Sequence, residues 1–520
     1  MWLYSEIRTL GDIPRHYGRT IADRPALIDA RGPISWAELD RHSNQIAQTL
    51  LGLGVTPGDR VAVLGKNTVQ YFGMLFGTSK VSAALLPLNW RLAPPELVDV
   101  IADARPHVLL ADAEYRAVAD TVVESTGLPC RVIGYDSTQP GDSEFDELVT
   151  AASTADPGTE VNPWQTAILM YTSGSTGKPK GVQLSHQNYL YLRLCEHLEP
   201  SFSCTPDDLM LTVMPLFHAM GVGLSLQALY NGAAVAVYSM PSPGELLELI
   251  GRDRPTIVPL VPTVIQMILD LPEADTTDFS CVRVMVYAGA PMPPPLLNRA
   301  IELIDCDFIQ FYGSTETCAG ITFLRPEQHR QGVKLASVGS PLPLVEIKVI
   351  GADGEEMPTG EVGELLVRAP SVTTGYFNKP ELTAAAFPNG WLRTGDGGYR
   401  DADGYIYLVD RIKDMIITGG ENVYSTEVEH ALASIDGVQL CAAVGVPDDK
   451  WGERVVAVVV ADPSAGLTEE VVIRRCRELI AGYKVPKEVR FVSTLPMTAS
   501  GKIMKNSLRD QLKQTRGLLT

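Results

Sequence analysis

The chain has 520 residues, and 43 Lys and Arg against 62 Asp and Glu give it a formal net charge of −19. A hydrophobic fraction of 45 % with 20 % charged residues excludes a disordered or fibrous protein, and the length suggests about three folding units. The acidic balance disfavours nucleic acid and anionic membranes as partners, although residues 471–520 carry 11 basic and 3 acidic side chains.

Eight cysteines are spread along the chain without a C-x-x-C pair, which disfavours disulfide frameworks and zinc sites. The N-terminal segment lacks the basic and apolar regions of a signal peptide, and no apolar run reaches the roughly 18 residues of a membrane span. These features predict a cytoplasmic protein with no transmembrane segment. A homodimer is left open as its assembly.

Short apolar runs alternate with helical patterns over most of the chain. Strands are expected at 60–65, 84–89 and 107–112, with helices at about 68–83 and 94–104 between them. Hydrophobicity in these strands is continuous rather than alternating, which indicates burial on both faces of a mainly parallel sheet. The body is therefore predicted to be a doubly wound α/β structure.

The pattern changes from about residue 340. The runs VEIKVIG, GELLVRA and GYIYLVD, separated by ADG turns, predict a small antiparallel β unit. After Asp410 the chain shows a helical STEVEHALASI, two strand-like runs, a basic helix at about 468–481 and a closing helix. This C-terminal part is predicted to be a compact α+β domain.

A phosphate-binding loop is predicted at YTSGSTGKPKG, residues 171–181. The segment follows the apolar strand TAILM and combines hydroxyls, glycines and lysines, which together suit a phosphate. A flexible Ser/Gly turn is the alternative. The glycine spacing and the strand-like GVQL that follows are not those of a Walker A loop. The candidate contacts are Thr172, Ser173, Gly174, Ser175, Thr176, Gly177 and Lys178.

The segment DFIQFYGSTETCAG, residues 307–320, places a carboxylate beside hydroxyls at the end of a strand. Glu316 there suits Mg²⁺, which prefers oxygen ligands and bridges nucleotide phosphates. Tyr312 is suited to stack on a base. A capped helix with a surface Glu is the alternative for this segment.

Three later segments complete the set of candidates. Asp396 in RTGD can accept hydrogen bonds from ribose hydroxyls, and Arg411 in DRIKD can bind ribose or phosphate. Gly419 and Gly420 let the backbone approach a thin ligand, and Lys502 lies on a small-residue loop near the basic end of the chain. Taken singly, these residues also fit a turn Asp, a surface Arg, a glycine hairpin and a solvated Lys.

The six motifs YTSGSTGKPKG, MPLFHAMG, FYGSTET, RTGD, DRIKDMIITGGENVY and PMTASGKI, in this order, closely resemble the adenylate-forming superfamily. Within it, the chain resembles the acyl-CoA synthetases, including the fatty-acid–CoA ligases. The resemblance implies a large N-terminal domain of two doubly wound α/β subdomains plus a β-barrel-like unit, and a small mobile α+β C-terminal domain. We expect the N-terminal domain to span residues 1–410 and the C-terminal domain to span residues 414–520. A hinge that contains Lys413 is expected between them, at residues 411–413.

The resemblance also implies the reaction and its cofactors, ATP, Mg²⁺ and coenzyme A. A carboxylic acid and ATP would give acyl-AMP and pyrophosphate, and the thiol of CoA would then displace AMP. The implied nucleotide contacts are Thr172 to Lys178 for the β- and γ-phosphates, Thr315 for the α-phosphate, Glu316 for Mg²⁺, Tyr312, Gly313, Gly289 and Ala290 around the adenine, and Asp396 and Arg411 for the ribose. Lys502 would bridge the substrate carboxylate and the α-phosphate, and Gly419–Gly420 would line the pantetheine channel.

The acyl side carries a weaker signal. MPLFHAMG has Phe217 and His218 where amino-acid-activating relatives commonly carry an Asp, which predicts an acid without an α-amino group. His218 is expected to line the acyl channel, with a core histidine as the alternative. Small or apolar candidates are Met220, Gly221, Val222, Gly223, Val261, Tyr287 and Cys318. Gly221 and Gly223 indicate an open, elongated tunnel. Medium- to long-chain fatty acids, and thus lipid metabolism, are the first hypothesis.

Two alternatives to free CoA ligation are kept. One is an acyl-AMP ligase that loads a carrier protein, or a luciferase-like oxygenase of the same superfamily. The other is a nucleotide-binding switch or ATPase that transfers no acyl group.

Overall fold

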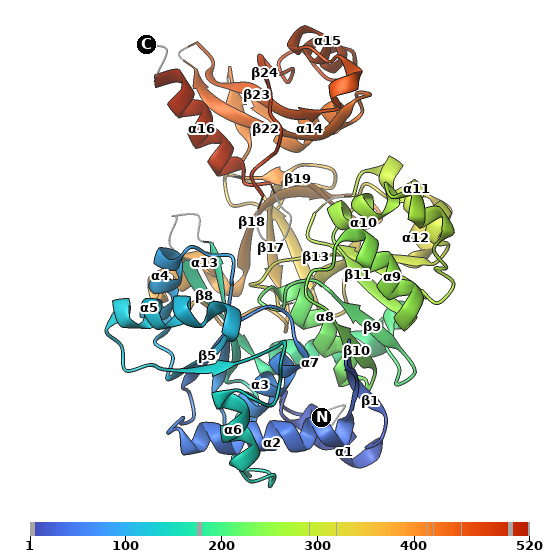
Figure 1. Cartoon of the computed structure of the whole chain (residues 1–520). Helices are drawn as coiled ribbons and strands as arrows, with labels where there is room; N and C mark the ends of the chain where they lie inside the picture. The colour runs from blue at the N-terminus through green and yellow to red at the C-terminus, as the bar shows by residue number, and fades with distance from the viewer. Residues whose placement is uncertain are drawn as a thin grey trace.

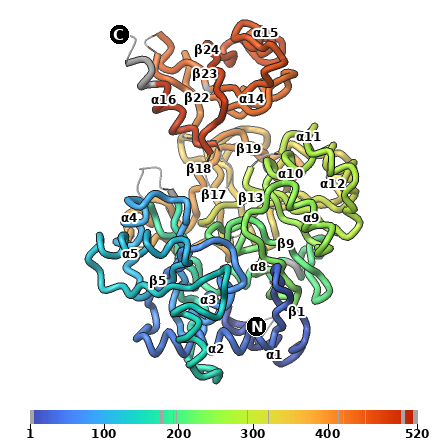
Figure 2. Tube along the Cα trace, in the orientation of Figure 1, coloured from blue at the N-terminus to red at the C-terminus, as the bar shows by residue number. Residues whose placement is uncertain are grey.

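In the computed structural model the chain forms a large body and a smaller C-terminal unit (Figures 1 and 2). The N-terminal helices lie in the body, and the last helix lies in the small unit. The residues described are 6–173, 179–290, 292–318, 320–412, 414–419, 421–448, 450–497 and 503–517.

The first sheet of the body has six strands in the order β6-β5-β3-β4-β7-β8. Its strands are β3 (Arg60–Leu64), β4 (Ala84–Leu88), β5 (Val108–Asp112), β6 (Arg131–Tyr135), β7 (Thr166–Ser173) and β8 (Pro179–Ser185). Helices α2 (Trp36–Gly52), α3 (Val69–Lys80), α4 (Pro94–Ala104), α5 (Arg116–Thr126) and α6 (Glu144–Ala151) connect or cover them. All pairs are parallel except β7 with β8, and β4 and β5 are buried along their whole length, which confirms the prediction.

The second sheet has nine strands in the order β15-β14-β13-β12-β11-β9-β10-β1-β2. These are β1 (Pro25–Asp29), β2 (Gly32–Ser35), β9 (Leu209–Thr212), β10 (Ala234–Val237), β11 (Ile257–Leu260), β12 (Val284–Ala288), β13 (Asp307–Gly313), β14 (Gly320–Leu324) and β15 (Ser340–Pro341). Its helices are α1 (Asp12–Thr20), α7 (His186–Leu198), α8 (Ala219–Tyr230), α9 (Pro243–Asp253), α10 (Pro262–Leu269), α11 (Pro294–Ile304) and α12 (Pro326–Gln331). The centre is parallel, and the edges β2, β14 and β15 are antiparallel.

The small β unit is a four-stranded antiparallel sheet in linear order. It consists of β16 (Glu346–Ile350), β17 (Gly363–Arg368), β18 (Leu392–Arg400) and β19 (Ile406–Arg411), with α13 (Pro380–Ala386) between β17 and β18. The antiparallel prediction is confirmed, and the described strands form an open sheet rather than a closed one.

The C-terminal unit has a five-stranded sheet covered by helices. The strands are β20 (Ile416–Thr418), β21 (Glu421–Val423), β22 (Val438–Asp448), β23 (Gly452–Ala461) and β24 (Glu488–Phe491), and the helices are α14 (Ser425–Ala433), α15 (Glu469–Leu479) and α16 (Lys505–Gly517). The helices expected at STEVEHALASI and 468–481 are both present. Short 3-10 turns lie at Ala113–Tyr115, Pro200–Phe202, Pro272–Thr276, Pro388–Gly390 and Pro463–Ala465.

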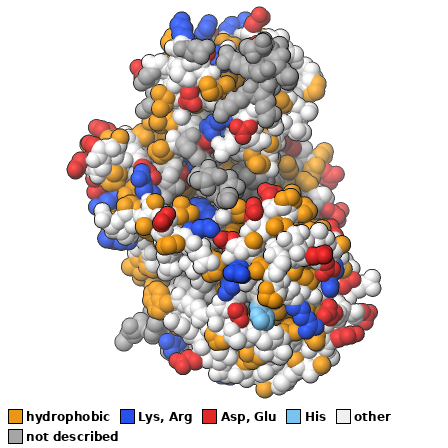
Figure 3. Space-filling model, turned by 90° about the vertical axis from the view of Figure 1, so that its left-hand side faces the viewer, with side chains coloured by type: hydrophobic (Ala, Val, Ile, Leu, Met, Phe, Trp, Pro, Cys, Tyr) orange, Lys and Arg blue, Asp and Glu red, His pale blue; other side chains and the backbone are white. Residues whose placement is uncertain are grey.

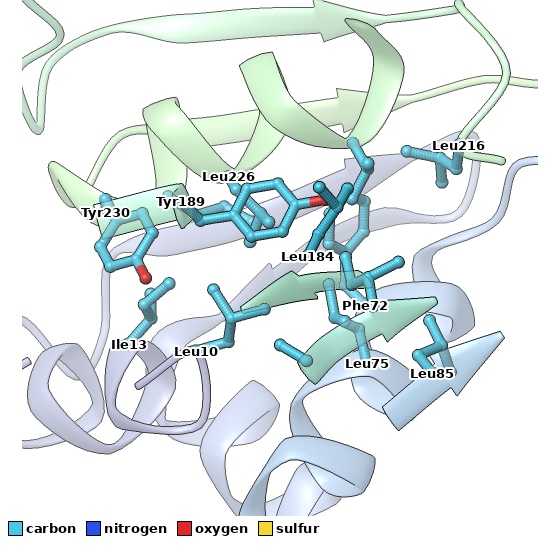
Figure 4. Close-up of a cluster of buried hydrophobic side chains, with 14 of the residues drawn as sticks. Leu10, Ile13, Phe72, Leu75, Leu85, Leu184, Tyr189, Leu216, Leu226 and Tyr230 are labelled. Atoms are coloured by element: carbon cyan, nitrogen blue, oxygen red, sulfur yellow. The ribbon is translucent and has the colours of Figure 1, made fainter. Parts of the chain in front are cut away.

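One large apolar cluster joins the two sheets of the body. Figure 4 shows part of it, where Ile13 of α1, Phe72 of α3, Leu85 of β4, Tyr189 of α7 and Leu226 of α8 are all fully buried. Its burial of apolar surface makes the two subdomains one folding body. All eight cysteines are free thiols. Within the residues described, none of the helices combines the length and apolar character needed to span a membrane.

Candidate active site

Three residues predicted to bind the nucleoside meet where β13, β18 and β19 come together. The Tyr312 hydroxyl donates to Asp396 Oδ2 at 2.6 Å, and Arg411 Nε lies 2.8 Å from Asp396 Oδ1. Asp396 and Arg411 are direct partners in the β18–β19 register. Burial and the Asp396 carboxylate raise the pKa of Tyr312, so the phenol stays protonated and donates. The pairing of β18 with β19 therefore positions the Asp396 carboxylate beside Arg411, and this carboxylate in turn orients the Tyr312 hydroxyl.

The predicted adenine turn, Gly289–Ala290, lies beside this cluster. It follows β12, and β12 and β13 pair in parallel with Ala288 opposite Phe311, one residue before Tyr312. Gly289 has a φ of +87°, a left-handed conformation that favours glycine. Both segments thus leave the carboxyl ends of neighbouring parallel strands, the edge where α/β sheets bind ligands.

The predicted metal ligand Glu316 belongs to a second cluster. Its Oε1 lies 2.8 Å from Lys180 Nζ of β8 and accepts a hydrogen bond from the Tyr376 hydroxyl at 3.0 Å. Lys180 Nζ also donates to the Tyr376 hydroxyl at 2.7 Å and lies 4.2 Å from the centre of its ring. Sequence reasoning missed Tyr376, because GYFNKP reads as an ordinary loop and only tertiary contact reveals its partners.

The Glu316 carboxylate is kept ionised by this cluster. Burial alone would raise the pKa of Glu316, but the charge of Lys180 and the hydrogen bonds from Lys180 and Tyr376 hold it below the ordinary value. The Glu316 side chain is 15 % exposed. A charged oxygen ligand is thus present near neutral pH.

The predicted phosphate loop connects the antiparallel strands β7 and β8. Thr172 and Ser173 end β7, and residues 174–178 lie outside the described part of the chain. The Thr172 hydroxyl is buried and has no hydrogen-bond partner among the described residues. Such a hydroxyl suits an anionic ligand that accepts a hydrogen bond from it. The segment after the loop is a strand, and α7 begins only after Ser185, which confirms the difference from a Walker A loop.

Gly313 and Thr315 lie between the two clusters in sequence. Gly313 is the last residue of β13 and pairs with Gly320 of β14. Thr315 lies in the following turn, where its carbonyl accepts from the Cys318 amide at 3.0 Å. This turn carries Glu316 four residues after Tyr312 and thus links the two clusters.

Some of the predicted acyl-side residues lie together. Cys318 is 1 % exposed in the main apolar cluster, and a Cβ at Gly223 would lie 3.6 Å from the Cys318 carbonyl oxygen. His218 is the residue before α8, and its ring stands 4.5 Å from that of Phe217, centre to centre. Met220 follows in the first turn of α8 and is half-buried.

Two of the acyl-side candidates, Gly221 and Tyr287, make close packing contacts. A Cβ at Gly221 would lie 2.3 Å from the Pro215 carbonyl oxygen, so this glycine permits close backbone packing and leaves no room for an acyl chain on that side. Tyr287 faces the second apolar cluster, where its hydroxyl lies 2.9 Å from His329 Nε2. Because successive residues of a strand face opposite sides, Tyr287 is turned away from the main cluster that holds Cys318. Val261 is buried between β11 and α10.

The structure describes one of the two glycines predicted to lie beside CoA, Gly419. The Gly419 amide donates to the Trp451 carbonyl at 2.7 Å, and a Cβ at Gly419 would lie 3.0 Å from the Trp451 ring. Gly420, the hinge residue Lys413 and the catalytic candidate Lys502 lie outside the described residues.

Several basic side chains of the C-terminal segment, residues 471–520, are paired with acids of the same unit. Its ion pairs are Lys484–Glu427, Lys505–Glu429, Arg509–Asp414 and Arg490–Glu488. Lys and Arg are likewise interspersed with Asp and Glu on the face shown in Figure 3. Part of the positive charge of this segment therefore balances nearby acids.

Comparison with known families identifies the chain. A family described as AMP-binding enzyme matches residues 15–377, and its C-terminal domain matches residues 427–502. The chain belongs to the AMP-binding enzyme family. The predicted resemblance and fold class are confirmed, since solved structures of this family have the same two-part α/β architecture.

Relatives of this AMP-binding enzyme are CoA ligases for different acids. Feruloyl-CoA synthase of an Amycolatopsis species is 38 % identical over 96 % of this chain and 98 % of its own. Long-chain-fatty-acid–CoA ligase FadD13 of Mycobacterium tuberculosis is 34 % identical over 93 % and 94 %. ATP-bound MatB from Rhodopseudomonas palustris has a TM-score of 0.89 at 30 % identity, covering 97 % of this chain and 99 % of that one.

The AMP-binding enzyme is thus an AMP-forming acyl-CoA ligase of a class that uses ATP, Mg²⁺ and CoA. The alternative of an ATPase without acyl transfer is not retained. The residues present fit Mg²⁺, which proteins usually hold through one or two carboxylates together with substrate phosphates. Glu316 offers one such carboxylate, and in the described part of the chain no group of three or more His, Cys, Asp and Glu forms a separate metal cage.

Proposed function

We propose that this ligase activates a hydrophobic carboxylic acid without an α-amino group, and that an aryl acid such as ferulate is its first candidate substrate. The proposal is supported by the 38 % identity with feruloyl-CoA synthase and by an acyl side built from Phe217, His218 and buried apolar residues. The close approach of the Pro215 carbonyl to Gly221 weakens the argument for an elongated alkyl tunnel, which then depends on Gly223.

The reaction begins with two anions that repel each other. A carboxylate oxygen of the acid attacks the α-phosphorus of ATP, the bond from that phosphorus to the bridging oxygen breaks, and pyrophosphate leaves with its electron pair. We assign Lys502 to the space between the two anions, where its charge offsets the repulsion as charge develops in the transition state. Thr315 is assigned to the α-phosphate.

The rest of the proposed nucleotide site holds ATP in place. Asp396 and Arg411 would bind the ribose, and Tyr312 with Gly289 and Ala290 would enclose the adenine. Residues Thr172 to Lys178 would hold the β- and γ-phosphates. Mg²⁺ held by Glu316 would neutralise phosphate charge and stabilise the pyrophosphate that leaves. The two clusters of hydrogen bonds and ion pairs, around Asp396 and around Glu316, support this proposal.

In the second step the sulfur of CoA attacks the acyl carbon of acyl-AMP. A thioester bond forms, the bond from carbon to the AMP oxygen breaks, and the thiol proton is released. We propose that the C-terminal domain, residues 414–520, rotates about the hinge at 411–413 between the steps, so that Lys502 leaves and Gly419–Gly420 reach the pantetheine. The cytoplasmic location and the homodimer stay predictions.

A panel of acids tests the substrate. Pyrophosphate release would be measured with ferulic, 4-coumaric, octanoic and palmitic acids and with phenylalanine, each with and without CoA. We expect the highest kcat/KM with the aryl-propenoic acids, thioester formation only with CoA, and no turnover of phenylalanine. A preference for palmitic acid would contradict the aryl proposal, and turnover of phenylalanine would contradict the absence of an α-amino group.

A fatty acid is the second candidate, because FadD13 is 34 % identical and a fatty acid–[acyl-carrier-protein] ligase of Streptomyces coeruleorubidus is 33 % identical over 98 % of this chain. The same similarity keeps a carrier protein open as the acyl acceptor. Replacing CoA with a phosphopantetheinylated carrier protein in the assay separates the two acceptors.

A further inference from the structure

The segment 371–379, between β17 and α13, lies along the outer edge of β8. The Phe377 amide donates to the Gly181 carbonyl at 2.8 Å, and the Gln183 amide donates to the Gly375 carbonyl at 3.1 Å. These bonds add the segment to the edge of the sheet that carries the β7–β8 hairpin. Backbone hydrogen bonds therefore hold this part of the segment against β8.

The same segment holds the turn that carries Glu316. The Thr373 amide donates to the Glu316 carbonyl at 2.8 Å, and the Thr373 hydroxyl donates to the Gln183 carbonyl at 2.5 Å. One short stretch of chain thus fixes a residue of the second sheet against a strand of the first.

Tyr376 lies at the centre of this segment and is 6 % exposed. Its hydroxyl accepts from Lys180 and donates to Glu316, so it makes a hydrogen bond to each member of the ion pair. If an anion draws Lys180 away, the carboxylate loses the charge that faces it while still partly buried, which is costly. The Tyr376 hydroxyl would keep a donor on that carboxylate.

The end of the segment is anchored separately on β7. Lys379 Nζ donates to Asp103 Oδ1 at 2.7 Å, and the Tyr171 hydroxyl donates to Asp103 Oδ2 at 2.6 Å. Asp103 of α4 therefore links the segment to β7, while the backbone bonds link it to β8. Segment 371–379 is thus linked to both strands of the β7–β8 hairpin.

We propose that Tyr376 is a positioning residue for nucleotide binding, holding Lys180 and Glu316 in register through its hydroxyl, and that segment 371–379 serves to place it. The inference rests on the proposed nucleotide site. It predicts a defect confined to Mg²⁺-dependent binding of ATP, with the acid and the thioester step unaffected.

The test compares Tyr376→Phe with Tyr399→Phe, a control on β18 whose ring stacks on Tyr407 away from this cluster. Binding of a non-hydrolysable ATP analogue is measured by calorimetry over a range of Mg²⁺ concentrations, alongside KM and kcat. We expect Tyr376→Phe to weaken analogue binding about tenfold and to raise the KM for ATP by a similar factor. The KM for the acid and thioester formation from supplied acyl-AMP should match wild type.

A second variant keeps the test decisive if Tyr376→Phe does not fold. Lys379→Met alters a side chain that is 41 % exposed, and it should weaken analogue binding in the same direction by a few-fold. If both variants bind the analogue as tightly as the wild type, the inference about Tyr376 is overturned while the proposed nucleotide site stands. Failure of the wild-type enzyme to bind the analogue with Mg²⁺ would overturn the proposed nucleotide site and the inference with it.

Discussion

The proposed nucleotide side and the proposed acyl side of this enzyme are built differently. On the nucleotide side, Asp396 and Glu316 are each held by a cation and a tyrosine hydroxyl within hydrogen-bond distance. On the acyl side, the residues expected together are divided between two apolar clusters, with Cys318 in one and Tyr287 in the other.

The difference follows from the forces involved. A partly buried carboxylate needs specific donors, so its partners are few and directional. Apolar contacts are non-directional, and many residue combinations fill the same space. The nucleotide side can therefore be inferred from motifs, whereas the acyl side depends on packing.

The largest expected effect concerns Lys502, which both sides would share. Lys502→Ala should lower the rate of acid-dependent pyrophosphate release by on the order of 10²–10³-fold, because no cation would offset the repulsion between the anions. Thioester formation from supplied acyl-AMP should be spared. Equal loss of both steps would refute the assigned role.

The next test removes the centre of the first nucleotide cluster. Asp396→Ala leaves Arg411 and the Tyr312 hydroxyl without their shared acceptor, and should raise the KM for ATP by roughly 10- to 100-fold with little change for the acid. Steady-state kinetics with each substrate varied would measure this. The matched control is Asp353→Ala, on an exposed turn of the β unit, which should behave as wild type.

Two glycines of α8 test the acyl side. Gly221→Ala should destabilise the fold by about 1–3 kcal/mol through its clash with the Pro215 carbonyl, and lower activity with all acids alike. Gly223→Ala meets Cys318 only at ordinary contact distance, and should keep the wild-type melting temperature while changing the ratio of kcat/KM between ferulic and octanoic acids by about tenfold. An unchanged ratio would remove Gly223 from the acyl side.

The smallest effect is expected in the basic C-terminal segment. Lys484 is paired with Glu427, whereas the exposed Lys487 donates from its ammonium group to the Gly482 carbonyl at 3.3 Å. Lys487→Glu should raise the KM for CoA by a factor of about two to five, and added salt should reduce the difference. An unchanged KM for CoA would mean that the positive charge of this segment only balances acids within the protein. Lys348→Glu on β16 serves as the control.

Much of the fold was predictable because its strands are buried on both faces. Continuous apolar runs located β3, β4 and β5 within one or two residues. The order of the strands in the sheets was not predictable, since β1 pairs with β10 although about 200 residues separate the two strands in sequence. Tyr376 was missed for the same reason, because its partners Lys180 and Glu316 lie far away along the chain.

The amino-acid sequence by itself determined the family and the reaction class, and it supplied the residues proposed for the nucleotide site, because phosphate, ribose and metal require particular polar groups in particular motifs. Only the tertiary structure decided which of these side chains meet, that Tyr376 joins them, and that Gly221 and Tyr287 serve packing. The reason is physical: motif chemistry is local, whereas contacts between sheets and the filling of apolar space depend on the whole chain.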